Sequence, residues 1–131
     1  MAQGPIDHPA YLTRQILNLG ATTAGTSGTS TTYLALPWDV NIHNVVAVVK
    51  TAGTATGHLV TLMTGTSTIA GSTVTLSTST AGVVGTSGNV AAKIVANTPI
   101  LVKNGTDGTG VAQVLIEFNI APDTGTWLGN E

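Results

Sequence analysis

The chain has 131 residues and no cysteine, and only 8% of its residues are Asp, Glu, Lys or Arg, against roughly 25% in an ordinary soluble domain. Its length fits one domain with its own core, and the lack of thiols excludes disulfide frameworks, thiolate zinc sites and cysteine nucleophiles. Four Lys and Arg residues are too few to neutralise a series of phosphates, which argues against nucleic-acid binding. Since net charge keeps free protein surfaces apart, so weakly charged a surface is typical of a subunit covered by protein neighbours.

Residues 1–30 differ in composition from the rest of the chain and are predicted to form an extended N-terminal arm, ahead of one domain over residues 31–131. The arm ends in Ala21–Ser30, a tract of Gly, Ser, Thr and Ala that behaves as a flexible coil unless something holds it. A neighbouring subunit would hold it, so we expect the arm to be the main contact element. The alternative is an arm folded back on its own domain.

Tyr11–Leu19 has two open interpretations, a short amphipathic helix or part of the extended arm. The chain does not open with a basic region followed by an apolar core, and no stretch reaches the roughly 20 apolar residues that a membrane-spanning helix needs. We therefore expect a protein made in the cytoplasm without export and without membrane contact.

Beyond the arm, threonine and valine dominate, and these β-branched residues favour strands over helices. Period-two alternation and β-branched runs predict strands at Thr31–Leu36, His43–Thr51, His58–Thr64, Ser72–Ser77, Lys93–Ala96, Pro99–Lys103 and Val111–Ile120. Glycine-containing turns separate them at Ala52–Gly57, Thr64–Ser67, Ala81–Asn89 and Asn104–Gly110. Gly88–Asn97 is a second, weaker helix candidate.

The longest run, Val111–Ile120, has one wholly apolar face, which should lie in the core: Ala112, Val114, Ile116, Phe118 and Ile120. About seven short strands with turns between them indicate an all-β fold, an antiparallel β-sandwich of the jelly-roll or Greek-key type.

Motifs for chemistry are weak in this chain. Asp123-Thr124-Gly125 matches the aspartic-protease triplet, but that chemistry needs a second facing aspartate, and a surface turn explains the triplet better. His8, His43 and His58 lack a metal-ligand spacing. No convergent acid, base and nucleophile set is visible, so we expect no enzyme activity, cofactor, metal or small-molecule substrate.

Aromatic and aliphatic side chains outside the predicted strands are the better candidates for function. Trp is favoured at protein interfaces because it buries a large area at low entropic cost. The alternative for each Trp is a place at one end of the sandwich core. The predicted partner-binding residues are Tyr11, Leu12, Ile16, Leu17, Leu19, Trp38 and Trp127.

The stretch from Asn41 to Pro122, about two thirds of the chain, resembles the small jelly-roll decoration or cement proteins of tailed-phage heads. The likeness consists of short Thr, Ala, Gly and Val strands, a late Pro-Ile-Leu-Val strand, a Gly-rich loop and a long alternating last strand, without a signature motif. It implies a subunit on the outer capsid surface of a virion, bound to the major capsid protein and bridging capsomers as a homo-oligomer (dimer or trimer).

Two other functions use the same sandwich. A carbohydrate-binding or fibre-type module would present exposed aromatic rings as a platform. A major capsid or spike subunit is the other possibility, although the usual major capsid folds need longer chains.

Overall fold

The computed structural model describes residues 14–23, 30–53, 59–76, 80–105 and 110–121 of the chain. These residues form strands and connecting loops, with no helix among them; accordingly, none of them belongs to a helix long and apolar enough to cross a membrane. The strands are β1 (Gln15–Thr23), β2 (Ser30–Leu34), β3 (Val40–Thr51), β4 (Leu59–Thr64), β5 (Ser67–Thr68), β6 (Val74–Thr75), β7 (Val84–Thr86), β8 (Ala92–Ile94), β9 (Ile100–Asn104) and β10 (Val111–Ile120).

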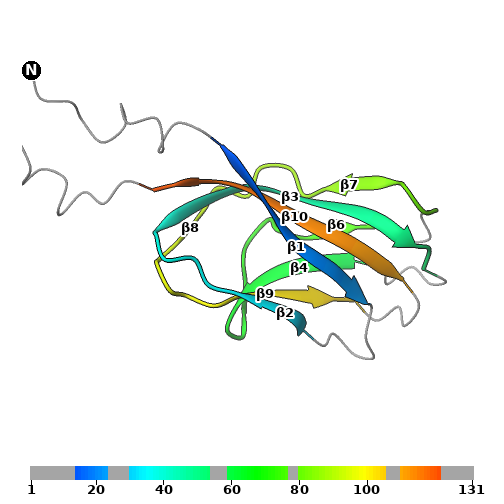
Figure 1. The fold of residues 1–131 in the computed structure, drawn as a ribbon, viewed down its shortest axis with the longest axis horizontal. Helices are drawn as coiled ribbons and strands as arrows, with labels where there is room; N and C mark the ends of the chain where they lie inside the picture. The colour runs from blue at the N-terminus through cyan, green and yellow to red at the C-terminus, as the bar shows by residue number, and fades with distance from the viewer. Residues whose placement is uncertain (1–13, 24–29, 54–58, 77–79, 106–109, 122–131) are drawn as a thin grey trace, which may run out of the picture.

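The strands form two antiparallel sheets packed face to face (Figure 1). The first sheet has the order β1-β10-β3-β7, with β8 pairing the other end of β3. The second has the order β2-β9-β4-β5, with β6 also pairing β4. The predicted all-β sandwich is therefore confirmed.

The strand pairs identify the sandwich as a jelly roll. The first four strands run antiparallel to the later ones in reverse order: β1 pairs β10, β2 pairs β9, β3 pairs β7 and β8, and β4 pairs β5 and β6. Folding this long double-stranded ribbon over itself brings β10 beside β3 and β9 beside β4. This wrapped ribbon is the jelly-roll arrangement.

The core lies between the two sheets and is built mainly from Val, Ile and Leu. On β10 the predicted inner face is confirmed for Ala112, Val114, Ile116 and Phe118, which are all buried, whereas Ile120 is half-buried. Each fully buried aliphatic side chain of this kind contributes about 1.5–3 kcal/mol to stability.

Residues 15–23 do not form a helix, which corrects one interpretation of Tyr11–Leu19. They form β1, hydrogen-bonded along its length to β10 of the same chain, with Gln15 opposite Phe118 and Thr23 opposite Val111. The described part of the expected arm thus lies against its own sandwich, and Gln15–Thr23 is one of the sandwich's strands. Residues 1–13 and 24–29 lie outside the described residues.

The helix candidate at Gly88–Asn97 is also wrong, because Ala92–Ile94 forms β8 on the edge of β3. Two strands occupy stretches expected to be turns, β5 after the Gly65 turn and the three-residue β7. The expected strand at Ser72–Ser77 is reduced to Val74–Thr75 among the described residues.

Both long edge strands carry a bulge. The pairing of β1 shifts between Asn18 and Gly20, and that of β2 shifts between Ser30 and Thr32. In β1 the N–H of Gly20, which has φ of 90°, donates to Oδ1 of Asn18 at 2.8 Å. Such a backbone conformation favours glycine because it has no Cβ.

Candidate functional site

One end of the sandwich is held together by Asp39. Its carboxylate oxygen Oδ1 accepts the N–H of Ala96 at 2.8 Å, and its backbone carbonyl accepts the N–H of Ala121 at 2.7 Å. Lys93 Nζ lies 3.7 Å from its second carboxylate oxygen. A further bond, from the N–H of Asn97 to the carbonyl of Leu36 at 2.7 Å, joins the same two loops. The β2–β3 loop, the β8–β9 loop and the end of β10 therefore form one connected surface.

Two large apolar side chains are exposed on these loops, Trp38 at 50% and Val95 at 62%. We call this surface, Leu36–Asp39 with Val95–Asn97 and Ala121, the Trp38 end. Gln15, the first residue of β1, lies opposite Phe118 near the end of β10, and Ala121 follows that strand. The exposed apolar groups thus lie at the end of the sandwich where β1 begins and β10 ends (Figure 1).

The predicted partner-binding residues fall into three groups. Ile16 and Trp38 are exposed, Ile16 at 71%. Leu19 is buried in the core, and Leu17 is partly buried and packs against the core. These two leucines therefore attach β1 to its own sandwich and leave little surface for a partner. Tyr11, Leu12 and Trp127 lie outside the described residues.

The outer face of the first sheet is weakly charged. Leu115 lies beside Val46, and Val48 lies beside Val84, which is 57% exposed. The ionic groups of this face are at its ends, with Lys50 near the end of β3 and the pair of Arg14 and Glu117 at the start of β1. Valine and leucine therefore occupy the middle of a sheet surface that normally carries polar residues.

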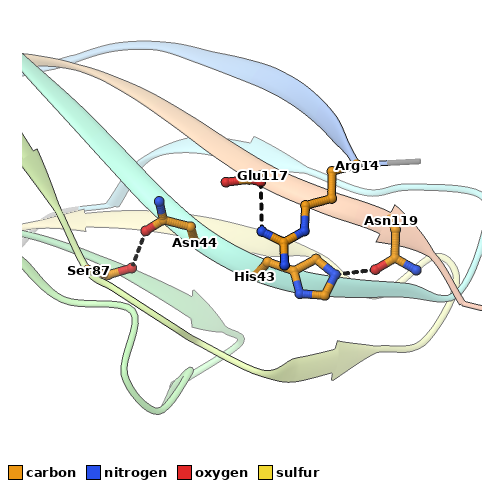
Figure 2. A network of polar contacts seen from close by, with 6 residues as sticks. All are labelled: Arg14, His43, Asn44, Ser87, Glu117 and Asn119. Atoms are coloured by element: carbon orange, nitrogen blue, oxygen red, sulfur yellow. Dashed lines mark hydrogen bonds and ion pairs between the residues drawn. The ribbon is translucent and has the colours of Figure 1, made fainter. Parts of the chain in front are cut away.

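A polar pocket opens at the ion-paired end of this face. It has a volume of about 400 Å³ and is lined by Arg14, His43, Asn44, Gly88, Asn89 and Glu117. The lining comes from four separate places in the chain: the residue before β1, strand β3, the β7–β8 loop and strand β10 (Figure 2).

A bulge in β3 explains how two consecutive residues line one pocket. Neighbouring residues of a strand normally point to opposite faces. The pairing with β10 shifts here, because Asn44 lies opposite Glu117 while Ile42 lies opposite Phe118, leaving His43 as an extra residue. An extra residue re-aims the side chains next to it, so His43 and Asn44 both reach the pocket while Ile42 stays in the core.

Hydrogen bonds hold the pocket in shape. Arg14 Nη1 and Glu117 Oε1 are 3.0 Å apart, and the hydroxyl of Ser87 lies 3.2 Å from Oδ1 of Asn44, to which it can donate (Figure 2). His43 Nε2 is hydrogen-bonded to Oδ1 of Asn119. These contacts fix Arg14, the pocket residues of β3 and β10, and the start of the β7–β8 loop relative to one another.

The loop after β7 is bonded along β3. Ser87 and Val45 exchange two bonds of 2.9 Å, from the N–H of Ser87 to the carbonyl of Val45 and from the N–H of Val45 to the Ser87 hydroxyl. The N–H of Val90 donates to the carbonyl of His43 at 2.9 Å. In this loop Gly88 and Ala91 have φ of 75° and 52°. For Ala91 the left-handed conformation costs about 1–2 kcal/mol, which the surrounding bonds offset.

The sequence does not predict this pocket. Of its lining residues, only His43 stands out in the sequence, as a possible metal ligand without a suitable spacing. Within the described ranges no group of three or more His, Cys, Asp and Glu residues is arranged to hold a metal ion. The aspartic-protease-like triplet lies outside the described residues.

No protein-family model matches the chain, and no curated protein matches it significantly in sequence.

Proposed function

We propose that this protein is a structural subunit of a virus or phage particle, which binds the outside of the capsid and bridges neighbouring copies of the major capsid protein as a homo-oligomer. The observation that carries this proposal is the Trp38 end, where a half-exposed tryptophan and Val95 lie at the end of the sandwich at which β1 begins and β10 ends. A tryptophan at the centre of an interface commonly contributes 2 kcal/mol or more to binding.

The low net charge supports a subunit whose surface is covered by neighbouring proteins. The chain carries four Lys and Arg residues and six Asp and Glu residues, a formal net charge of −2, and two of the four cations are ion-paired. Long-range repulsion between such sandwiches is small, so many copies can sit close together on one particle. Weak individual contacts then add up through repeated, simultaneous binding.

The jelly roll agrees with this role without proving it. Viral capsid domains and lectins both use the fold, and a fold by itself does not determine function. A carbohydrate-binding module that stacks sugar rings on an aromatic platform would need neighbouring exposed rings. Tyr33 lies on the outer face of the second sheet, beside Leu101 of β9, whereas Trp38 lies in the loop before β3.

Particle binding is the direct test. The purified full chain is mixed with shells assembled from the major capsid protein encoded in the same genome, and the bound fraction is measured by sedimentation. We expect saturation at a fixed ratio of chain to capsid protein. Trp38→Ala should weaken binding by about 30-fold or more, as for loss of a 2 kcal/mol interface residue.

Tyr33→Ala is the matched control, because it removes another exposed aromatic ring, 70% exposed, from the outer face of the second sheet and outside the Trp38 end. This variant should bind within about twofold of the original protein, a change near 0.4 kcal/mol. A chain that never sediments with the shells would refute the proposed function. Equal binding by Trp38→Ala and the original chain would refute the Trp38 end as the contact surface.

A further inference from the structure

The polar atoms of the pocket are only partly used by contacts among the described residues. Arg14 gives one guanidinium nitrogen to one oxygen of Glu117, which leaves further N–H donors on the guanidinium and the second oxygen of the carboxylate. Asn44 is bonded to Ser87 through Oδ1, so its NH₂ group remains. The side chain of Asn89 bonds to no other described residue. The pocket therefore presents donors and acceptors side by side.

This mixture matches hydroxyl groups better than it matches an ion. A hydroxyl donates one hydrogen bond and accepts up to two, so a ligand with several hydroxyls can use both kinds of group. Phosphate offers acceptors almost alone and would meet the Glu117 carboxylate, while a metal cation would meet the Arg14 guanidinium. Because Arg14 and Glu117 are paired at 3.0 Å, their charges cancel locally and favour an uncharged ligand.

Size and surroundings agree with one or two sugar rings. The pocket volume of about 400 Å³ falls in the range of roughly 300–1,000 Å³ that is typical of small-molecule sites. Ile16 lies opposite Glu117 in the strand register and is exposed, which places an apolar side chain at the margin of the pocket. The C–H face of a sugar ring can pack against such a side chain.

The pocket is also shaped before any ligand arrives. The β3 bulge directs His43 and Asn44 to the same side, and the β7–β8 loop that carries Gly88 and Asn89 is bonded to β3 on either side of them. A ligand therefore orders few groups when it binds, which lowers the entropic cost of a weak interaction.

From these features we infer that the pocket binds an uncharged saccharide, as the terminal or branch unit of a glycan. The inference goes beyond the proposed structural role and does not depend on it, since the test uses the isolated full-length protein and no particle.

The experiment is an NMR titration of the ¹⁵N-labelled full chain with methyl glycosides of glucose, galactose, mannose and N-acetylglucosamine, with inorganic phosphate and Mg²⁺ as separate ligands. We expect at least one glycoside to shift the backbone amides of Asn44, Gly88 and Asn89, with a dissociation constant on the order of 1 mM for so small a ligand. Asn89→Ala and Asn44→Ala should each weaken that binding about fivefold, the effect of losing one hydrogen bond.

Gln113→Ala is the matched control, because it removes an amide side chain from the same strand and face as Glu117 without touching the pocket. It should bind the glycoside within twofold of the original protein. Saturable shifts with phosphate or Mg²⁺ but with no glycoside would overturn the ligand class. Glycoside shifts that map outside the pocket, or that persist unchanged in both asparagine variants, would overturn the site.

Discussion

Replacement of Gly85 by alanine tests how closely the two sheets pack. Gly85 lies on β7 opposite Ala47 and faces the core, where an added Cβ would come within 2.8 Å of Val74 Cγ1 and 2.9 Å of Leu76 Cδ2. Ordinary contacts begin near 3.4 Å. Both neighbours are buried, and Val74 is β-branched and stiff, so the sheets must move apart or a side chain must leave its rotamer.

The expected loss follows from two opposing effects. Overpacking a core by one methyl group costs about 1–3 kcal/mol. Replacing glycine recovers about 0.4–1 kcal/mol, because the unfolded chain becomes less flexible. With the middle of each range, Gly85→Ala should therefore lower the free energy of unfolding by about 1.3 kcal/mol. Urea unfolding followed by far-ultraviolet circular dichroism should show a midpoint lower by about 0.5–1 M.

A double-mutant cycle isolates the cause. Val74→Ala alone opens a cavity and destabilises the protein, but in the Gly85→Ala background it makes room for the new methyl group. The pair should therefore be less destabilising than the sum of the two single changes, by at least about 0.5 kcal/mol. A neutral Gly85→Ala variant, or strictly additive effects, would show that the close approach of β7 to Val74 is not a feature of the folded protein.

Three further substitutions are expected to separate strong from weak contacts in the same urea assay. Ser72→Ala should lower the free energy of unfolding by about 1–3 kcal/mol, because it removes the buried hydroxyl that accepts the N–H of Leu62 at 3.1 Å. A loss below about 0.5 kcal/mol would contradict that bond. Glu117→Gln should lower the free energy of unfolding by less than about 1 kcal/mol, because its partner Arg14 is more than half exposed, and this loss should vanish in about 1 M NaCl. A larger loss that persists in salt would argue against a surface ion pair. Ala91→Gly should raise the free energy of unfolding by up to about 1 kcal/mol by relieving its left-handed backbone, and destabilisation would show that no strain is stored there.

Strand β10 was predictable from the sequence because its inner face is apolar without interruption. Alternation over Val111–Ile120 predicted the bounds and the buried positions, except that Ile120 is half-buried and Asn119 is buried. The wholly apolar inner positions are what made the two-residue period visible.

Strand β1 was not predictable because a bulge breaks its period. Leu17 and Leu19 face the core and Ile16 faces solvent, and after the extra residue the alternation restarts at Gly20. A short apolar pattern with such an interruption resembles a helical face. Strand β7 was not predictable for a different reason: its single inward residue is Gly85, which carries no hydrophobic signal and is typical of a turn.

The pocket could not be predicted from the sequence, for a third reason. Its lining residues are separated by up to 103 positions along the chain, from Arg14 to Glu117. They meet only because β1 and β3 flank β10 and because a bulge in β3 turns His43 outward. Neither the strand order nor a bulge leaves a local pattern in the residues concerned.

The bulged and shortened edge strands protect this chain against uncontrolled aggregation. Sequences rich in Val and Thr with few charges are those from which fibrils grow, one strand adding to the next along an open sheet edge. In this jelly roll the long edges, β1 and β2, have interrupted hydrogen-bonding patterns, and β5, β6, β7 and β8 offer only two or three residues each. Backbone shape thus limits the strand-to-strand pairing between copies that ionic side chains limit in other proteins.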